Sequence, residues 1–522
     1  MGIGRKDADQ AETPVIDAIA EFNRIQPAYF CIPGHRFEQG MPDDLKTAFG
    51  EGIFRYDLTE ADGLDDLQDP HGAIDRAQKL AAEAFGADRT WFSVNGTTAA
   101  NMAMILACAG PGEEILVARN SHKSVMRGLI LSGARPVWIE PEYDDTWGIA
   151  AKTEPAAVEK AIEGHPHAKA VMIVSPTYYG TASDIKAISD ICHSHGLPLL
   201  VDEAHGTHFA FSKRLPGEAL QCGADLVSMS IHKTAGAMTQ SSVLHFKDCG
   251  FVDPFRVDTA LIMVMSTSPS YVLMSSLDAA RKQLALHGTE MADRAVELAL
   301  MLRKKLQTIP GIAVFGGADE EKLKKNDIDI TRVTFSAFAA GMSGTDLKDR
   351  LFKESRISLE MADALNVVAV ITFANEERDI ERLAEAVKKA LSALYGAERA
   401  ADFRNSKDIP EREKSTDSGI SADFGNDDNI SGRENGALPA AAQMKMLPRD
   451  AYFAEGEYIS IREANGRISK GVICPYPPGI PYVNPGELIT EDIIDRLLYC
   501  MSQGVPVHGI DDSGSIEVVK AG

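Results

Sequence analysis

Short apolar runs alternate with helical stretches from about residue 75 to residue 250. The apolar runs predict strands at residues 90–94, 114–118, 136–140, 170–175, 197–203, 225–230 and 241–246. Four of them are apolar along most of their length, as expected for strands buried on both faces of a sheet. This alternation predicts βαβ crossovers, and therefore an α/β fold with a mainly parallel sheet and helices on both faces.

The segments on either side of this region follow different patterns. Residues 1–60 indicate an arm, with a short helical pattern near residues 15–24 and Gly- and Pro-containing extended chain through "CIPGHRFEQG". A long helix is predicted over about residues 271–308. Beyond it, "RVTFSAF" and "NVVAVITF" predict strands, and an amphipathic helix follows with Asn375 as its expected N-cap. We interpret residues 310–396 as a smaller α+β unit.

A polar stretch separates this unit from the end of the chain. Residues 411–436 are poor in apolar side chains and rich in Ser, Asp, Asn and Gly, which is typical of a linker. Apolar residues return near Met446, and "CPYPPGIPYVNPGE" predicts rigid turns and extended chain. We therefore expect an arm (1–60), a large domain (61–300), a small α+β domain (301–400), a linker (401–445) and a C-terminal α+β domain (446–522).

Composition excludes several classes of protein. The chain has 76 acidic and 53 basic residues, for a net charge of −23, which argues against nucleic acid or an anionic membrane as the main partner and suits a cationic small substrate. Its seven cysteines form no CxxC pair, so neither a disulfide framework nor a metal site is indicated. The sequence shows no secretory h-region and no membrane-spanning apolar run, and a cytoplasmic location is expected.

Polar side chains follow two predicted strands at the edge where an open α/β sheet binds its ligands. After residues 90–94, "NGTTAAN" places Thr97 and Thr98 at the start of a helix, where free N–H groups suit a phosphate. After residues 114–118, "RNSHKS" contains His122. Taken singly, motifs of this kind more often mark an ordinary helix cap and a structural or surface histidine.

Two further strands end in groups that are costly to bury. Asp202 opens "DEAHGTHF" at the end of an apolar strand, and Lys233 follows another strand in "SMSIHKTAGAM", beside Ser230 and His232. Desolvation penalises both charged groups, and it prepares a lysine amine as a nucleophile. A turn-capping aspartate and a solvated loop lysine are the ordinary explanations.

The four motifs together indicate one cofactor, pyridoxal phosphate, which carries a phosphate, a basic ring nitrogen and an aldehyde. Lys233 would form the Schiff base, Asp202 would keep the pyridine nitrogen protonated, and His122 would lie flat on the ring. The expected phosphate ligands are Thr97, Thr98, Ser230 and His232. No metal is expected.

The chain resembles the Orn/Lys/Arg decarboxylases of the aspartate-aminotransferase fold (fold type I). The resemblance extends from about residue 33 to the end and is carried by "PGHRFEQG", "RNSHKS", "SPTYYG", "VDEAHGTHFAF", "SIHKTAGAMTQSS", "STSPSYVLMSSLDAAR" and "GRISKGVICPYPPGIPYVNPGE". It is similar to the shorter, biosynthetic form, which lacks the N-terminal response-regulator-like domain of the larger acid-induced enzymes. The long acidic stretch at 411–436 departs from the family pattern.

The resemblance implies a lyase that decarboxylates arginine, lysine or ornithine, with arginine slightly favoured because of the likeness to the short form. It implies the cofactor roles already described, with Ala204 packed beneath the ring. It also implies a homo-oligomer built from dimers, with the active site near the interface and Ser266–Tyr271 reaching the partner's cofactor. Either Lys233 or His232 would return a proton to the substrate α-carbon.

A long cationic substrate needs acceptors at the far end of its pocket. Glu360, Asp363 and Glu487 are the candidates that the sequence offers, although solvated or capping roles explain them equally well.

Other functions fit parts of the pattern. An aminotransferase, aldolase or β-lyase of the same fold would use the same lysine and aspartate, but the chain shows no evident small-domain arginine motif for an α-carboxylate. Intact Lys233, Asp202 and His122 argue against a non-catalytic, cofactor-binding regulatory paralogue, although an altered substrate pocket would be enough to silence such a protein. A nucleotide-binding protein is disfavoured, because neither GxGxxG nor GxxxxGK[ST] follows a strand.

Overall fold

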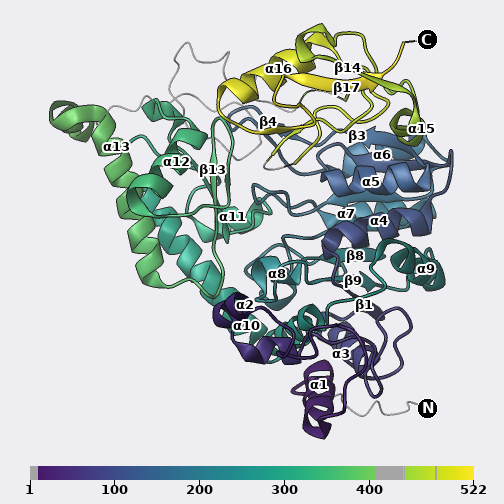
Figure 1. Cartoon of the computed structure of the whole chain (residues 1–522). Coiled ribbons are helices and arrows are strands. Elements are labelled where there is room, and N and C mark those ends of the chain that lie inside the picture. Colours follow the sequence, from purple (N-terminus) through teal and green to yellow (C-terminus); the bar gives the residue numbers. More distant parts are fainter. Residues whose placement is uncertain (1–9, 406–438, 440, 477–478, 522) are drawn as a thin grey trace.

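The computed structural model describes residues 10–405, 439, 441–476 and 479–521. It contains one large sheet, one small sheet and a C-terminal region, which we define as residues 441–521 (Figure 1). The predicted linker stretch 411–436 lies outside the described residues. The domain boundaries proposed from the sequence remain a prediction.

The large sheet has seven strands in the order β1-β9-β8-β7-β6-β2-β3. Its strands are β1 (Arg89–Ser93), β2 (Glu114–Ala118), β3 (Arg135–Ile139), β6 (Val171–Val174), β7 (Leu199–Asp202), β8 (Leu226–Met229) and β9 (Ser242–Phe246). Neighbouring strands from β3 to β8 pair in parallel, whereas β9 pairs antiparallel with both β8 and β1. All seven predicted strands are present, and the expectation of a mainly parallel sheet is confirmed.

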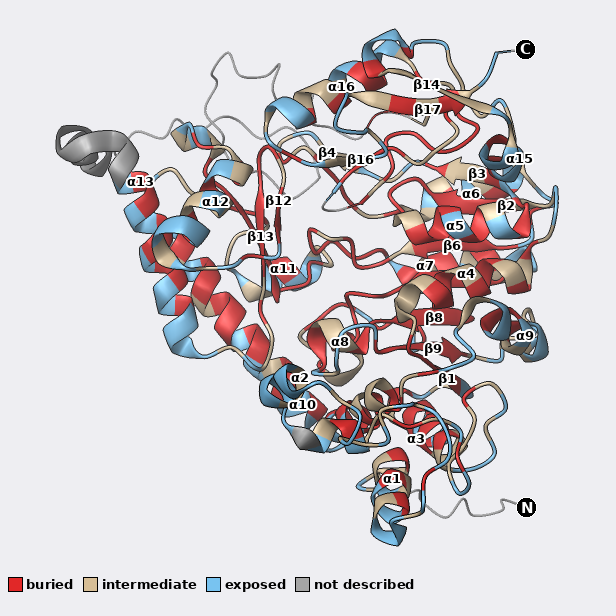
Figure 2. Cartoon of the chain, in the orientation of Figure 1, coloured by how far each residue is buried: buried red, intermediate tan, exposed pale blue. Residues whose placement is uncertain are grey.

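Helices cover both faces of the large sheet because alternate strand residues point to opposite sides. Leu199 and Val201 enter one apolar cluster, whereas Leu200 enters another. One face packs against α4 (Gly96–Cys108), α5 (Lys123–Ser132) and α9 (Pro254–Val264). The other face packs against α3 (Ala73–Phe85), α6 (Pro155–Gly164), α7 (Ile185–Ser194) and α10 (Tyr271–Gln307). The sheet is therefore buried on both sides (Figure 2).

The remaining short elements around the large sheet belong to the arm and the loops. They are α1 (Pro14–Ile25), α2 (Asp43–Phe49), β4 (Tyr143–Asp144), β5 (Ile149–Ala150) and α8 (Ile231–Thr234). The arm is tied to α10, since the Val15 N–H donates to Asp278 Oδ2 over 2.9 Å. Within the described residues, no helix combines the length and the apolar character needed to cross a membrane.

The small sheet has four antiparallel strands in the order β10-β11-β13-β12. Its elements are β10 (Ala313–Val314), α11 (Glu320–Lys325), β11 (Arg332–Ser336), α12 (Gly344–Ser355), β12 (Met361–Ala362), β13 (Val367–Val370) and α13 (Glu377–Asn405). The expected N-cap was wrong: α13 begins at Glu377, and Asn375 Oδ1 accepts from the Thr372 N–H instead, so its side chain closes the preceding turn.

The C-terminal region forms its own apolar cluster beneath α16. Its elements are α15 (Pro448–Phe453), β14 (Gly456–Ser460), β15 (Cys474–Pro475), α16 (Glu491–Ser502), β16 (Val507–His508) and β17 (Ser515–Val519). A fully buried arginine at the end of β2 attaches this region to the large sheet: Arg119 donates to the carbonyl oxygens of Pro481 and Tyr482 over 2.8 and 2.9 Å. The loop 479–487 is thereby held over the carboxyl end of the large sheet.

Candidate active site

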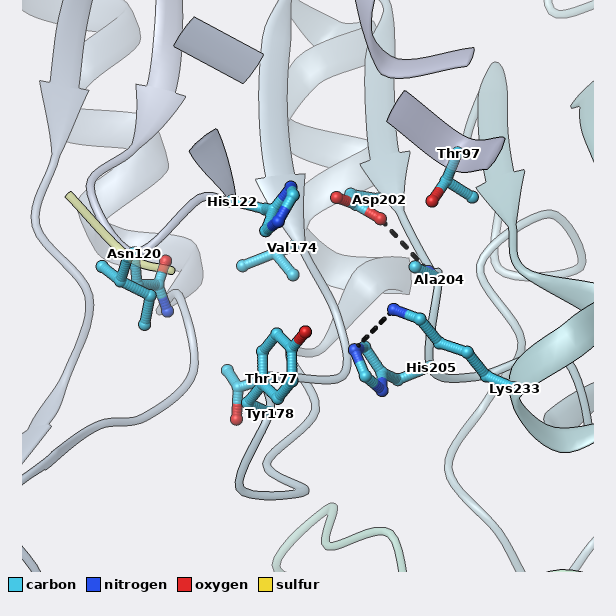
Figure 3. A pocket seen from close by; sticks show the side chains of 11 residues that line it. Thr97, Asn120, His122, Val174, Thr177, Tyr178, Asp202, Ala204, His205 and Lys233 are labelled. Atoms are coloured by element: carbon cyan, nitrogen blue, oxygen red, sulfur yellow. Dashed lines mark hydrogen bonds between the residues drawn. The ribbon is translucent and has the colours of Figure 1, made fainter. Parts of the chain in front are cut away.

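A pocket opens beyond the carboxyl ends of β2, β6, β7 and β8, which is where an open α/β sheet binds its ligands (Figure 3). Its lining residues are Thr97, Asn120, His122, Val174, Thr177, Tyr178, Asp202, Ala204, His205, Lys233 and Ile480. Five of the residues singled out from the sequence therefore meet in one place: Thr97, His122, Asp202, Ala204 and Lys233. Ile480 comes from the C-terminal region, so that region completes the pocket wall.

Lys233 points into this pocket from α8, directly after β8 (Figure 3). Its Nζ lies 2.9 Å from His205 Nε2 and 5.7 Å from the centre of the Tyr178 ring. Burial lowers the pKa of Lys233 to about 8, and the Asp202 carboxylate only partly opposes that effect. About a tenth of this side chain is therefore a neutral, nucleophilic amine at pH 7, far more than for an ordinary lysine.

Asp202 is buried at the end of β7 and is held by neutral donors. Asn101 Nδ2 donates to Asp202 Oδ2 over 2.7 Å, and the Ala204 N–H donates to Oδ1 over 3.2 Å. Burial raises the pKa of Asp202, and Lys233 and Asn101 oppose the rise. A buried carboxyl of this kind is suited to share a proton with a basic ring nitrogen.

His122 is held in one orientation at the start of α5. Its Nδ1 accepts from the Ser124 N–H over 3.2 Å and lies 2.9 Å from Ser124 Oγ. Burial, and then the charge of Lys233, lower the pKa of His122 to about 4. The ring is therefore neutral and carries its proton on Nε2.

The start of α4 offers donors for an anion. Gly96 adopts φ +71°, which lets the chain turn sharply into the helix, and no side chain caps the first turn. Thr97 Oγ1 lies 3.1 Å from Ser230 Oγ, so the two hydroxyls meet beside the free helix N–H groups. This donor set, the lysine and the buried carboxyl fit the phosphate, the aldehyde and the ring nitrogen of pyridoxal phosphate.

Several predicted site residues lie elsewhere. Thr98 is partly buried but does not line the pocket. His232 turns away from it, and its Nδ1 lies 2.9 Å from the Ser241 carbonyl oxygen. Ser266 lies next to the start of α4, where its N–H donates to Asn95 Oδ1 over 3.4 Å.

The three predicted substrate carboxylates are also outside the pocket. Asp363 is half-buried and accepts from the Tyr179 hydroxyl over 2.7 Å, whereas the buried Glu487 pairs with Arg119 at 3.4 Å in the C-terminal interface. Glu360 is exposed in a separate cleft beside the small sheet. It is still near enough for its charge to favour protonation of Lys233.

The structure adds polar residues that the sequence reasoning missed. Asn101 connects the Asp202 and His122 sites, because its Nδ2 donates to both Asp202 and Ser124 Oγ, and its Oδ1 accepts from Ser228 Oγ over 2.7 Å. Its spacing in the sequence could have identified it, because Asn101 follows Thr97 by four residues and therefore lies on the same face of α4.

Asn120 was missed as well. Its Nδ2 donates to the Ala151 carbonyl oxygen over 3.0 Å, and its Oδ1 is buried with no hydrogen-bond partner among the residues that the structure describes. A buried acceptor of this kind is suited to receive an N–H group of a ligand.

One group of three side chains in the described residues has spacing suited to a metal ion. Atoms of His193, Asp225 and Cys249 lie within 4.8 Å of one another, at the opposite end of β8 from Lys233. Asp225 Oδ2 is already engaged, at 2.8 Å from His193 Nε2 and 2.8 Å from the Leu199 N–H. We interpret this group as a polar link between α7 and the sheet.

Comparisons with known proteins point to one family and one fold. The models for the major and the C-terminal domains of the Orn/Lys/Arg decarboxylases match residues 13–349 and 434–505. The arginine decarboxylase of Bacillus subtilis is 37% identical over 513 residues, and that of Halalkalibacterium halodurans is 39% identical over 513 residues; each match covers 98% of both chains. The solved constitutive lysine decarboxylase of E. coli superimposes with a TM-score of 0.78 at 21% identity, covering 98% of this chain and 82% of that one.

Proposed function

The chain belongs to the Orn/Lys/Arg decarboxylase family and is a pyridoxal-phosphate-dependent decarboxylase of a basic amino acid, and from this premise we propose that its substrate is arginine. The observation that carries the proposal is the 37–39% identity, over nearly the full length, to two proteins named arginine decarboxylase. The products are then agmatine and carbon dioxide.

We propose the following roles for the residues of the pocket. Bound pyridoxal phosphate supplies an electron sink for the bond that breaks at the substrate α-carbon. Lys233 attaches the cofactor through Nζ, and Asp202 holds a proton at the cofactor ring nitrogen. Thr97 and Ser230 bind the phosphate together with the first N–H groups of α4, and His122 and Ala204 enclose the ring.

Proton return to the substrate is assigned to Lys233 rather than to His232. Both were candidates from the sequence. Lys233 Nζ faces the pocket and has a pKa of about 8, which suits an acid that must also give up its proton near neutral pH. His232 does not line the pocket.

The guanidinium group of arginine needs acceptors at the pocket wall. We propose Asn120 Oδ1 as one of them, because it is a buried acceptor without a partner in the described part of the chain and its amide is fixed by Ala151. Glu360 contributes negative charge from the small sheet. Asp363 and Glu487 are engaged in structural contacts and are proposed to act only by holding the surrounding loops.

We also propose a homo-oligomer built from dimers. Large apolar side chains are exposed on the arm and on α9, among them Phe30 (90%), Phe49 (63%), Phe255 (72%) and Met263 (70%). Such exposure is typical of surfaces that bind another chain. Light scattering after size exclusion should give a mass of at least twice 56.4 kDa, and a 56.4 kDa species would contradict the proposal.

The test of the substrate is direct detection of the product. Purified protein with pyridoxal phosphate is offered arginine, lysine and ornithine separately, and the amines are identified by mass spectrometry. Agmatine should dominate. Cadaverine as the main product would identify lysine as the substrate instead, and putrescine would identify ornithine. No amine, with cofactor bound, would favour another fold-type-I reaction or a non-catalytic role.

A further inference from the structure

A buried arginine reaches the active-site lysine through a histidine. Arg332 is the first residue of β11 in the small sheet and is 1% exposed. Its Nη2 lies 2.5 Å from His205 Nδ1, and His205 Nε2 lies 2.9 Å from Lys233 Nζ. The three side chains thus form a chain of contacts that joins the small sheet to the pocket (Figure 3 shows the His205–Lys233 end).

The direction of these hydrogen bonds follows from which groups carry protons. A guanidinium has only donors, so His205 Nδ1 must accept from Arg332. The proton of the neutral imidazole is then on Nε2, and it points at Lys233. A lysine ammonium also has only donors, so a charged Lys233 would point an N–H group at the N–H of His205 Nε2. Both contacts can form together only when Lys233 is an uncharged amine whose lone pair accepts from His205.

We propose that Arg332 is a positioning residue that fixes the tautomer of His205 and thereby favours the uncharged form of the cofactor-attaching amine of Lys233. The small sheet thereby influences the protonation of Lys233, although no residue of its four strands lines the pocket. This role of Arg332 rests on the proposed role of Lys233 as the attachment point, and it does not depend on which amino acid is the substrate.

The electrostatics of the pocket agree with this arrangement. Burial, and then the charges of Lys233 and Arg332, hold the pKa of His205 well below its usual range, so the ring does not become a cation. The groups that face or adjoin Lys233 from the surrounding elements are Asp202, Glu360, Arg332, His122, His205, His232 and Tyr178. Asp202 and Glu360 favour the ammonium, whereas burial and Arg332 favour the amine.

Glycine at position 180 allows Arg332 to approach this closely. A Cβ at Gly180 would lie 2.7 Å from Arg332 Cβ and 3.0 Å from Arg332 Cγ. The "SPTYYG" loop therefore packs directly on the arginine stem and leaves it little freedom to withdraw from His205.

The experiment measures the pKa of Lys233 itself in the cofactor-depleted, full-length protein. Trace acetylation with acetic anhydride is followed over pH 5–11, and mass spectrometry of the Lys233 peptide gives its reactivity at each pH. In the natural protein, half-maximal reactivity is expected near pH 8. In Arg332→Met it should move up by about one pKa unit, so that labelling of Lys233 at pH 7 falls about tenfold.

A double-mutant cycle separates the tautomer from the charge of the arginine. If Arg332 acts through His205, Arg332→Met should change the pKa of Lys233 little in a His205→Phe background. An equal change in both backgrounds would mean that Arg332 acts by its charge alone, and would overturn the proposal. So would an Arg332→Met variant whose Lys233 still titrates near pH 8.

Controls guard against unfolding and indirect effects. Arg350→Met removes an arginine of the same small-sheet unit that bonds Ala390 and Glu354, away from the pocket, and should leave Lys233 unchanged. If Arg332→Met does not fold, Arg332→Gln serves instead. Its side-chain amide can accept as well as donate, so it no longer fixes the tautomer of His205. It should raise the pKa of Lys233, as Arg332→Met does. Circular dichroism and thermal melting verify each variant.

Discussion

At the scale of single residues, burial controls the chemistry of the pocket. The same desolvation lowers the pKa of Lys233 and raises that of Asp202, which moves the two groups toward their neutral forms. Neutral donors then decide the orientation of each group: Asn101 fixes Asp202, and Ser124 fixes His122. The site is therefore shaped by hydrogen bonds from side-chain and backbone groups that do not themselves react.

Replacing Lys233 with alanine should abolish both cofactor attachment and turnover. The variant lacks the amine that binds the cofactor, so the visible absorbance of the attached cofactor disappears and turnover falls on the order of a thousandfold or more. Spectra and amine release measure the two effects. Lys213→Ala, an exposed lysine, is the control and should behave as the natural protein. Full activity in Lys233→Ala would refute the proposed site.

A pair of buried glutamates next to Asp202 should make stability depend on pH. Burial, and then the neighbouring Glu218, hold the pKa of Glu203 well above its usual range, and burial raises the pKa of Glu218 to about 7. A carboxyl whose pKa is raised in the folded state contributes stability that is present below its unfolded pKa of 4.5 and is lost as pH rises through about 7.

Glu218→Gln should therefore reduce the fall in melting temperature between pH 5.5 and pH 8.5. The variant weakens one contact to the Leu220 or Gln221 N–H at every pH, so the pH dependence is compared and not the absolute value. Glu159→Gln, on the exposed side of α6, should melt with the pH dependence of the natural protein. An identical fall in Glu218→Gln would show that the pair does not titrate in this range.

At the scale of elements, helix ends and close approaches position the site. Helix α4 begins just after the carboxyl end of β1 because Gly96 turns the chain. The next turn of the helix places Asn101 beside Asp202. Helix α12 approaches the loop between β12 and β13 so closely that only glycine fits at its first residue. That loop holds Asp363 and Asn366, which bond Tyr179 and Trp147 in the region of the large sheet.

Gly344→Ala should destabilise the small-sheet unit. A Cβ at this position would lie 2.2 Å from the Asn366 carbonyl oxygen and 2.5 Å from that of Asp363, and backbone cannot yield as a side chain can. We expect a loss of about 1–3 kcal/mol in the free energy of unfolding, measured by denaturant titration. Gly164→Ala is the matched change in α6, where nothing lies within 4 Å; it should gain up to about 1 kcal/mol. Equal effects in the two variants would contradict this account.

At the scale of the whole molecule, three units far apart in the sequence converge on one pocket (Figure 1). The large sheet supplies most of the lining, the C-terminal region adds Ile480, and the small sheet reaches Lys233 through Arg332 and His205. The C-terminal region is attached by Arg119, which is fully buried against Glu487 and over the ring of Trp138. Loss of that attachment should open the pocket on the side that Ile480 lines.

Arg119→Leu should therefore loosen the C-terminal region and weaken cofactor retention. It leaves Glu487 buried without its cation, which costs about 3–5 kcal/mol. Hydrogen exchange should increase in residues 479–487, and the cofactor should dissociate faster on dilution. Arg449→Met removes an exposed contact across the same interface, to the Leu131 carbonyl oxygen, and should cost no more than about 1 kcal/mol. Unchanged exchange at 479–487 in Arg119→Leu would show that Arg119 is not the attachment point.

The sequence by itself determined the elements and the reactive core of the site. Strands β2, β6, β7 and β8 were predictable because burial on both faces demands continuous apolar runs. The convergence of Asp202 and Lys233 followed from that prediction, since the carboxyl ends of parallel strands meet at one edge of the sheet. The motifs around these residues also identified the family, which the comparisons confirmed.

Only the tertiary structure decided which side chains from other units reach that edge. Arg332 belongs to another sheet, and its contact with His205 depends on how the two sheets pack, which no local pattern encodes. The position of Ile480 in the pocket depends on packing in the same way. So does the position of Asp363 and Glu487 outside it, because a carboxylate beside a predicted loop is equally compatible with binding a substrate and with holding the loop. Local periodicity fixes the direction of a side chain within its own element, whereas its partners are fixed by the packing of elements distant in the sequence.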